Sequence, residues 1–133
     1  MLSLPYVAGI VDGEGCISVA KRGPYITPTV QVANTDIGLL EIFYNQFGGN
    51  IDRNRESRPN RKPCHCWRLA GRAAKTFVQQ IRPWLLIKGP QANIICGLIE
   101  RRPGERMDSA DFKYNEDVTA LIRSLNRRGH AVI

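Results

Sequence analysis

The chain has no long apolar run, and its longest uninterrupted stretches, such as Trp84-Leu85-Leu86-Ile87, are only the size of a core segment. A membrane-spanning helix needs about 18 to 20 apolar residues, so the sequence predicts no span and no membrane partner. The opening segment Met1-Leu2-Ser3-Leu4-Pro5 has no basic residue ahead of an apolar stretch, so we expect no signal peptide. These absences predict a soluble intracellular protein, and they leave open whether its compartment is a prokaryotic cytoplasm or an organelle matrix.

The cysteines lack the spacing of a metal or disulfide framework. Cys64-His65-Cys66 does not have the two-residue gap of a zinc-binding pair, and Cys16 and Cys96 stand in apolar surroundings without ligand partners. The sequence therefore predicts small, buried, reduced thiols in a reducing compartment.

Acidic residues are outnumbered in this chain. Nineteen Lys and Arg face twelve Asp and Glu, which leaves a formal net charge of +7. Such an excess on a small domain favours a polyanionic partner, nucleic acid before a membrane surface. Charge alone leaves open the alternative of an uncommitted basic surface. With 133 residues, the chain is long enough for one hydrophobic core and too short for two, so a single domain over residues 1–133 is expected.

Apolar periodicity predicts an α+β domain of order αββαββα, followed by C-terminal helices. Alternating apolar residues predict four strands, the first two in a hairpin and the others near Asn50–Arg55 and His65–Leu69. The helices are marked by Leu4, Val7, Ala8 and Val11; by Leu40, Phe43 and Phe47; by Ala74, Phe77, Val78 and Ile81; by Ala92, Ile95, Cys96 and Ile99; and by Val118, Leu121, Ile122 and Leu125. Four antiparallel strands with helices on one face leave the other face free to bind a partner.

The strands predict a polar surface on that open face. Apolar residues such as Ile17 and Val30 take the phase that meets the helices, and the alternate positions are mostly polar. The residues expected on or beside the open face are Ser18, Arg22, Gln31, Arg53, Arg55 and Arg68, with Tyr25, Thr27 and Thr29 at the hairpin. These side chains suit phosphates and base edges in a DNA major groove, and an ordinary solvated face is the alternative. Alternation does not decide whether Trp67 or Arg68 faces inward.

The segment from Val7 to Gly15 combines three unusual features. Gly9 and Gly13 lie four residues apart in a predicted helix, where each glycine costs about 1 kcal/mol relative to alanine, so we expect another backbone to approach closely. Asp12 and Glu14 stand at the end of that helix, where the helix dipole disfavours carboxylates and a bound cation would offset the penalty. The helix also runs almost directly into a strand, which would hold Glu14 in place.

These residues resemble the signature of the LAGLIDADG homing endonucleases, because Val7-Ala8-Gly9-Ile10-Val11-Asp12-Gly13-Glu14-Gly15 matches all nine positions in type. The segment from Arg82 to Asn93 resembles the lysine-bearing stretch of the same enzymes, and the element order agrees, so the resemblance covers a core of about residues 4–101 and leaves a C-terminal helical segment, 102–133. Members with one motif act as homodimers, so the resemblance implies a homodimer packed on the motif helices. The implied interface residues are Val7, Ala8, Gly9, Val11, Asp12 and Gly13.

The resemblance also implies the chemistry. It implies cleavage of double-stranded DNA at a long pseudo-palindromic site by metal-dependent phosphodiester hydrolysis, in an intron- or intein-associated homing endonuclease. It assigns Mg²⁺ to Glu14 and the Gly13 carbonyl, with Mn²⁺ or Ca²⁺ able to substitute in binding, and catalytic roles to Glu14, Lys88 and Asn34. Asp12 is expected to close the helix and organise the interface. A further basic residue of the family has no match at Ile37-Gly38-Leu39.

Two other functions fit the same fold. One is a maturase that binds its own intron RNA with weak or lost cleavage, and the other is a non-catalytic DNA-binding regulator. The presence of both Glu14 and Lys88 favours the nuclease, because a purely DNA-binding surface has no need of an acid facing a polyanion. Tyr6 and Trp84 are expected to pack inside rather than stack on bases, and His65 and His130 are assigned no catalytic role.

Overall fold

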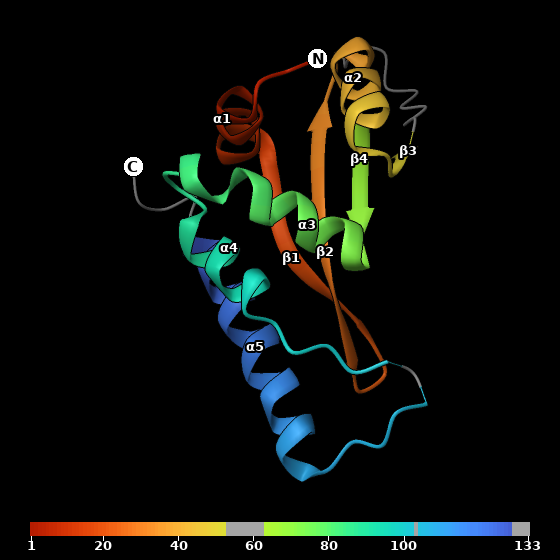
Figure 1. Cartoon of the computed structure of the whole chain (residues 1–133), viewed down its shortest axis with the longest axis vertical. Helices are drawn as coiled ribbons and strands as arrows, with labels where there is room; N and C mark the ends of the chain where they lie inside the picture. Colours follow the sequence, from red (N-terminus) through yellow and green to blue (C-terminus); the bar gives the residue numbers. More distant parts are fainter. Residues whose placement is uncertain (53–62, 103, 129–133) are drawn as a thin grey trace.

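The computed structural model describes residues 1–52, 63–102 and 104–128. Its element order confirms the predicted αββαββα arrangement with further helices after it (Figure 1). The elements are α1 (Leu4–Glu14), β1 (Gly15–Arg22), β2 (Tyr25–Asn34), α2 (Ile37–Phe47), β3 (Asn50–Asp52), β4 (His65–Ala70), α3 (Gly71–Ile81), the 3₁₀ turn η1 (Arg82–Trp84), α4 (Gly89–Cys96) and α5 (Ser109–Arg128).

The strands form one antiparallel sheet of order β1-β2-β4-β3. Helices α1, α2 and α3 pack on one face of this sheet, while α4 and α5 lie beside its β1 edge (Figure 1). The opposite face carries no helix in the described part of the chain, and we call it the open face. This arrangement is the predicted one, with a buried face and a face available for binding.

Local chemistry determines where the first helices begin and end. The Ser3 hydroxyl accepts the Tyr6 amide at the start of α1, and the Asp36 carboxylate accepts the amides of Gly38 and Leu39 at the start of α2. Such N-caps satisfy helix amides that have no partner inside the helix. Gly15 joins α1 directly to β1. A Cβ at this position would lie only 2.8 Å from the Val11 carbonyl oxygen, which is too close for any residue with a side chain. The predicted direct passage from helix to strand therefore requires glycine at this position.

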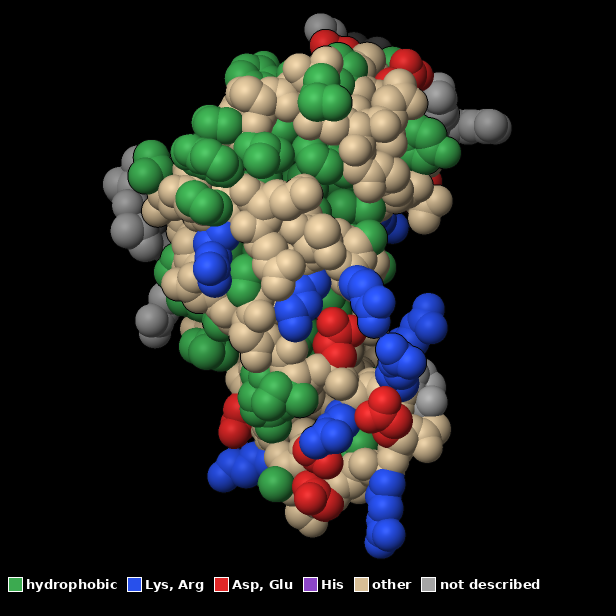
Figure 2. Space-filling model, viewed as in Figure 1, with side chains coloured by type: hydrophobic (Ala, Val, Ile, Leu, Met, Phe, Trp, Pro, Cys, Tyr) green, Lys and Arg blue, Asp and Glu red, His purple; other side chains and the backbone are tan. Residues whose placement is uncertain are grey.

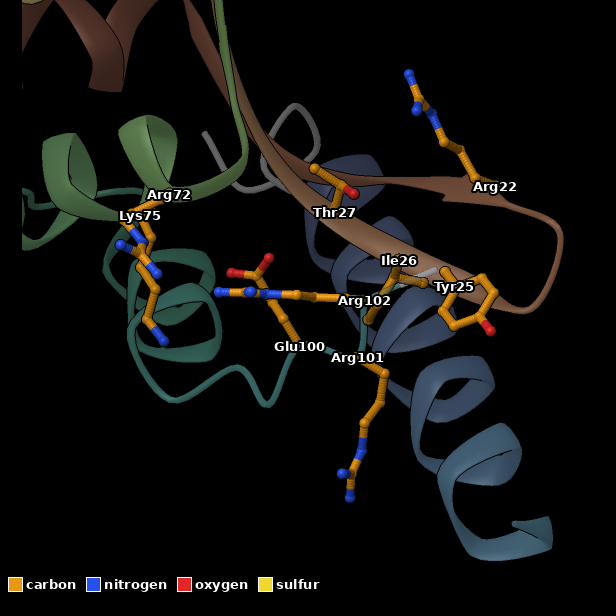
Figure 3. Close-up of a pocket in the computed structure, with 9 residues that line it drawn as sticks. All are labelled: Arg22, Tyr25, Ile26, Thr27, Arg72, Lys75, Glu100, Arg101 and Arg102. Carbon is orange, nitrogen blue, oxygen red and sulfur yellow. The ribbon is translucent and has the colours of Figure 1, made fainter. Parts of the chain in front are cut away.

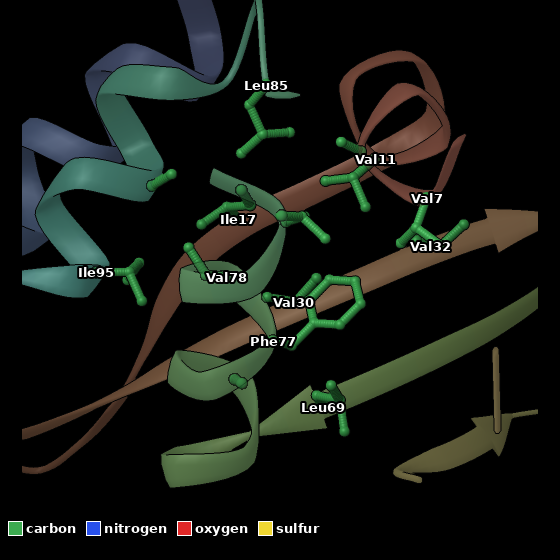
Figure 4. Close-up of a cluster of buried hydrophobic side chains, with 14 of the residues drawn as sticks. Val7, Val11, Ile17, Val30, Val32, Leu69, Phe77, Val78, Leu85 and Ile95 are labelled. Atoms are coloured by element: carbon green, nitrogen blue, oxygen red, sulfur yellow. The ribbon is translucent and has the colours of Figure 1, made fainter. Parts of the chain in front are cut away.

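An aromatic cluster lies at the centre of the hydrophobic core beneath α2 and α3. Trp67 is fully buried, its ring centroid lies 5.0 Å from Phe43 and 5.2 Å from Phe77, and its indole N–H donates to the Gly48 carbonyl at 2.8 Å. Aliphatic side chains from the sheet and α3 fill the space beside it (Figure 4). Because Trp67 faces the helices, its neighbour Arg68 faces the open side, which decides the orientation that alternation left unresolved.

The C-terminal helix α5 covers the free edge of β1. The Asn126 amide donates to the Ile17 carbonyl at 3.1 Å, and the Asn115 amide donates to the Pro24 carbonyl at 2.9 Å. Between these two contacts Ile122 is fully buried. An uncovered edge strand exposes backbone groups that can pair with another chain, so α5 closes this side of the sheet.

Several sequence expectations need adjustment. The fourth helix ends at Cys96, and Ile99 lies beyond it and is exposed. The described part of the third strand is Asn50–Asp52, and the predicted binding residues Arg53 and Arg55 lie outside the described residues. All four cysteines are described and are free thiols, but none is buried as predicted. Among the described helices, none is both long and apolar enough to cross a membrane.

Candidate nucleic-acid interface and active site

The strand register brings the predicted polar residues onto one surface. Cys16 of β1, Gln31 of β2, Arg68 of β4 and Asn50 of β3 form one row across the sheet, and Ser18 pairs with Thr29 in a neighbouring row. Seven predicted binding residues share this side of the strands: Ser18, Arg22, Tyr25, Thr27, Thr29, Gln31 and Arg68. The structure therefore places them together, and their contact with DNA stays a prediction.

Arg68 stands near the centre of the open face. Its guanidinium lies 3.9 Å from the Asp52 carboxylate, and both side chains are largely exposed, so the pair is weak. The neighbouring Cys66 side chain raises the pKa of Arg68 further above its usual value, so this residue stays charged. Burial raises the pKa of the Cys16 thiol, and this effect is larger than the lowering caused by the positive charge of Lys88. The thiol in the same row is therefore neutral at pH 7.

Glu14 lies at the junction of α1 and β1, with its side chain exposed. Its Oε2 accepts a hydrogen bond from Asn34 Nδ2 at 2.5 Å. Asn34 is itself oriented, because its Oδ1 accepts the Asp36 amide at 2.8 Å. Two residues predicted to be catalytic, from the ends of α1 and β2, are thus in contact, and Asn34 holds one oxygen of the Glu14 carboxylate.

Lys88, the third predicted catalytic residue, is bound to the same end of α1. Its Nζ donates to the Asp12 backbone carbonyl at 2.7 Å. The Asp12 carboxylate accepts three backbone amides, from Leu86 at 2.7 Å, Ile87 at 3.1 Å and Lys88 at 2.9 Å. Glu14, Asn34 and Lys88 therefore converge at the C-terminal end of α1, although they come from three separate segments of the chain.

The predicted interface residues of α1 lie in two different environments. Val7, Ala8 and Val11 are fully buried in the core of their own chain, and the Asp12 carboxylate binds the chain's own amides. Within one chain these four residues contact their own core and amides, and the prediction that counts them with Gly9 and Gly13 as interface residues stays a prediction. Gly9 and Gly13 are exposed, and a Cβ at either position would find nothing within 4 Å.

Large apolar side chains surround these two glycines. Tyr6 is 57% exposed, Trp84 44%, Leu86 92% and Ile87 57%. The prediction that Tyr6 and Trp84 pack inside is therefore wrong. Figure 2 shows hydrophobic side chains gathered over the half of this surface that carries α1 and α2. Leu86 and Ile87 belong to the apolar run of residues 84–87, whose length is that of a core segment, but four consecutive apolar residues in a short connection cannot all reach one core.

Comparisons with known proteins find similar structures but no similar sequence. No family model matches the chain, and no curated protein matches it in sequence. The homing endonuclease I-CvuI, solved in complex with the I-CreI target, superposes with a TM-score of 0.67 at 20% identity over 92% of this chain and 80% of that one. The archaeal intron-encoded homing endonuclease I-Vdi141I, complexed with DNA, gives a TM-score of 0.69 at 17% identity over 92% of this chain and 82% of that one. The LAGLIDADG homing endonuclease I-GzeII gives 0.61 at 18% identity, over 92% of this chain and 44% of that one.

The chain has the LAGLIDADG homing endonuclease fold. The resemblance read from the nine residues at 7–15 is thus matched by the architecture of the whole chain. I-GzeII is the longer protein, and this chain spans less than half of it. This chain therefore corresponds in structure to only part of I-GzeII.

At the far end of the LAGLIDADG sheet, below the β1–β2 hairpin, lies a basic hollow of about 690 Å³. It is lined by Arg22, Tyr25, Ile26 and Thr27 from the hairpin, Arg72 and Lys75 from α3, and Glu100, Arg101 and Arg102 from the segment after α4 (Figure 3). Arg101 pairs with Asp111 at 3.1 Å. Within the described residues, Arg72 and Arg102 form no ion pair. No sequence argument singled out this hollow, because its cations come from three distant segments.

The metal that the fold implies can be tested against the available donors. Among the described residues, no three His, Cys, Asp or Glu side chains lie close enough together to hold a metal ion. The carboxylate of Glu14 is the acidic group that one chain offers beside Asn34 and Lys88, because both oxygens of Asp12 accept backbone amides. Mg²⁺ uses hard oxygen ligands, often only one or two carboxylates, and keeps several waters. The Glu14 carboxylate of one chain is therefore compatible with a divalent ion of this kind and supplies one of its ligands.

Proposed function

We propose that this chain is a homodimeric, metal-dependent endonuclease that cuts both strands of a long, pseudo-palindromic DNA site. The observation that carries the proposal is the convergence of Glu14, Asn34 and Lys88 at the α1 end of the polar open face. A carboxylate, an amide that orients it and an ammonium group beside a surface of Arg, Gln, Ser and Thr suit hydrolysis of a bound phosphodiester. The similar proteins I-CvuI and I-Vdi141I are homing endonucleases solved in complex with DNA, which supports the same substrate class.

The open face supports recognition of several base pairs by each chain. β1 has eight residues, so at roughly 3.3 Å per residue Arg22 lies about 23 Å from Gly15. At roughly 3.4 Å per base pair this distance corresponds to about seven base pairs. Two chains related by a two-fold axis near α1 would double that length and read a pseudo-palindrome. Arg68 and Gln31, near the middle of the face, suit direct contact with base edges.

The glycines of α1 support dimerisation. Each costs about 1 kcal/mol in a helix relative to alanine, and nothing inside the chain lies near enough to require it. Close approach by α1 of a second copy would explain why positions 9 and 13 are glycine. The same contact would bury four apolar side chains that are exposed in one chain: Tyr6, Trp84, Leu86 and Ile87. Contact through this face brings two Glu14 carboxylates together, which completes the donor set that one chain lacks.

Mg²⁺ is the cofactor that these donors suit, with Glu14 and the Gly13 carbonyl as its expected ligands and Mn²⁺ or Ca²⁺ as substitutes in binding. When bound, the ion would neutralise phosphate charge and supply a reactive water for the displacement. The crystals of I-CvuI with DNA contained Mg or Ca, which is consistent with a divalent ion. Two carboxylates held close together repel each other strongly unless a cation lies between them.

The side chains of the protein have separate tasks in this proposal. Asn34 donates to Oε2 of Glu14 and so fixes the carboxylate plane, which leaves Oε1 without a hydrogen bond in the described structure. The ammonium group of Lys88 provides positive charge where the phosphate gains negative charge. In the hydrolysis, a water oxygen bonds to phosphorus, the bond from phosphorus to the 3′ oxygen breaks, and that oxygen takes up a proton.

A selection with random DNA tests the proposal. Purified protein would be incubated with Mg²⁺ and circular plasmids that carry randomised inserts of about 24 base pairs, and linearised plasmids would be sequenced. We expect a single pseudo-palindromic consensus and cleavage of both strands. The Glu14→Gln protein, which keeps the side-chain shape and loses the charge, should yield no linear plasmid.

Two outcomes would contradict the proposal. Linear product without a shared sequence would remove site specificity. Selective binding of structured RNA with no DNA cleavage in Mg²⁺ or Mn²⁺ would identify a maturase instead. A shift assay with labelled RNA and DNA, run on the same protein at the same salt concentration, separates these cases.

A further inference from the structure

We infer that Asp12 is a positioning residue that holds Lys88 in the active site, and that it is not a metal ligand. Its carboxylate accepts the backbone amides of residues 86–88, which we call the lysine segment. Oδ2 accepts the Leu86 amide at 2.7 Å, and Oδ1 accepts the amides of Ile87 at 3.1 Å and Lys88 at 2.9 Å. Hydrogen bonds from backbone amides to an ionised carboxylate are among the stronger ones in proteins.

The lysine segment has no other regular support. It lies between η1 and α4, outside every helix and strand. Leu86 and Ile87 are exposed, so their side chains do not anchor it in the core. Without the Asp12 carboxylate, three consecutive amides would turn to water, and the described contacts that remain are the Lys88 side chain on the Asp12 backbone carbonyl and the flanking elements η1 and α4.

The same residue also holds the end of the lysine side chain. Nζ of Lys88 donates to the Asp12 backbone carbonyl at 2.7 Å, at the C-terminal end of α1, where the helix dipole favours a cation. Asp12 thus determines where both the main chain and the ammonium group of Lys88 lie, across 76 positions of sequence. Because Glu14 is two residues further along, this contact also determines the spacing between lysine and carboxylate.

This assignment separates the two acids of the 7–15 motif. Glu14 has an oxygen without a hydrogen bond among the described residues, whereas three backbone amides already occupy three of the about four acceptor sites of the Asp12 carboxylate. Asp12 acts on the reaction only through Lys88. The inference rests on the proposed function for its effect on cleavage, but the tether itself can be measured without any cleavage.

The kinetic test compares Asp12→Ala, Lys88→Ala and the double variant on the selected DNA site. In single turnovers with saturating enzyme, we expect Asp12→Ala to slow cleavage about 100-fold, as misplacement of a catalytic group by about 1 Å can do, while the dissociation constant for DNA without metal stays within about threefold. The double variant should be no slower than Lys88→Ala alone, because a residue that acts through Lys88 has no effect once the lysine is gone. Asp12→Asn should be intermediate, since it keeps one acceptor oxygen and places an NH₂ group against an amide donor.

Asp108→Ala is the matched control. The carboxylate of Asp108 likewise accepts a backbone amide, from Asp111, but it is exposed and lies at the start of α5, far from α1 (Figure 1). It should lose stability as Asp12→Ala does, without slower cleavage. Additive losses in the double variant, or equal slowing in Asp108→Ala, would overturn the inference.

A second measurement does not depend on cleavage. The acetylation rate of Lys88 by acetic anhydride, followed by peptide mass spectrometry, should rise several-fold in Asp12→Ala, with exposed Lys113 of α5 as the internal reference. Amide hydrogen exchange of residues 86–88 should accelerate in parallel. If both stay unchanged, Asp12 does not hold the segment, whatever the activity. If both change but the unaltered protein cuts no DNA, the tether stands and the proposed function fails.

Discussion

At the α1 end of the open face each chemically important side chain is held by another part of the chain, whereas at the hairpin end the cations are mostly unpaired. Glu14 is bound by Asn34, and Lys88 by Asp12. Below the hairpin, Arg72 and Arg102 form no ion pair within the described structure, and Lys75 reaches only the Leu98 carbonyl. The difference indicates that the α1 end holds its side chains in a fixed geometry, whereas the hairpin end presents positive charge.

The two ends should therefore respond differently to substitution and salt. Cleavage depends on atoms placed to within a fraction of an ångström, while attraction of phosphates depends on net charge and tolerates mobile side chains. Substitutions near α1 should alter the rate of cleavage at constant affinity. Substitutions on the rest of the open face should alter affinity and its salt dependence at a constant rate.

The largest effect is expected from Glu14→Gln. Amide replaces carboxylate at the same size, so Mg²⁺-dependent cleavage should fall by several orders of magnitude. Affinity for DNA without metal should hold or improve, since repulsion from phosphates and from the second Glu14 is removed. Single-turnover rates and gel-shift titrations measure the two quantities, and near-normal cutting of both strands would remove the proposed role of this carboxylate.

Gly9→Leu should come next. A side chain at Gly9 meets nothing inside the chain, so the monomer should fold normally and gain up to about 1 kcal/mol of helix stability. Close contact with a second α1 should be blocked, giving a folded monomer without detectable cleavage. Sedimentation velocity with thermal unfolding checks both points, and Gly9→Ala should show a milder loss. An active Gly9→Leu dimer would show that α1 is not the interface.

Arg68→Ala should have a smaller effect, on binding alone. One lost phosphate contact lowers the slope of log affinity against log salt by about 0.9, while a lost contact to a base costs about 1–3 kcal/mol and relaxes specificity at one position. Titrations at several salt concentrations, with Lys113→Ala as the control away from the sheet, separate the two. Unchanged affinity and slope would mean that the open face does not bind DNA.

Asn126→Ala should have the smallest effect. It removes the hydrogen bonds to the Ile17 carbonyl and from Gln91, so the free energy of unfolding should fall by about 1–2 kcal/mol. Denaturant unfolding measures it against Gln79→Ala, an exposed position on α3. Because Asn126 supports the β1 edge rather than the site, saturating cleavage rates should not change. A slower rate would show that α5 also shapes the active end.

Much of the fold could be predicted because its signals are local. Capping residues, helical and alternating periodicity, and glycines at turns act within a few positions, so the order of elements could be inferred segment by segment. Gly15 illustrates this, because a direct passage from helix to strand leaves no room for a Cβ. Most open-face residues were likewise predictable, since alternate side chains of a strand point to opposite faces.

Other features depended on contacts between distant segments. Alternation could not orient Trp67 and Arg68, because that choice depends on where Phe43 and Phe77 place the core. The exposure of Tyr6 and Trp84, and the burial of Val7, Ala8 and Val11, likewise follow from how α1 and η1 pack together.

By itself the sequence determined the kind of fold, because residue type, periodicity and spacing are local properties, and its resemblance to a known family singled out Glu14, Asn34 and Lys88. Only the tertiary structure decided that Asp12 holds the lysine segment and that Asn34 holds Glu14. Hydrogen bonds of this kind depend on positions and directions to within a few tenths of an ångström. That accuracy arises only once the packed core has placed α1, β2 and the segment before α4 beside one another.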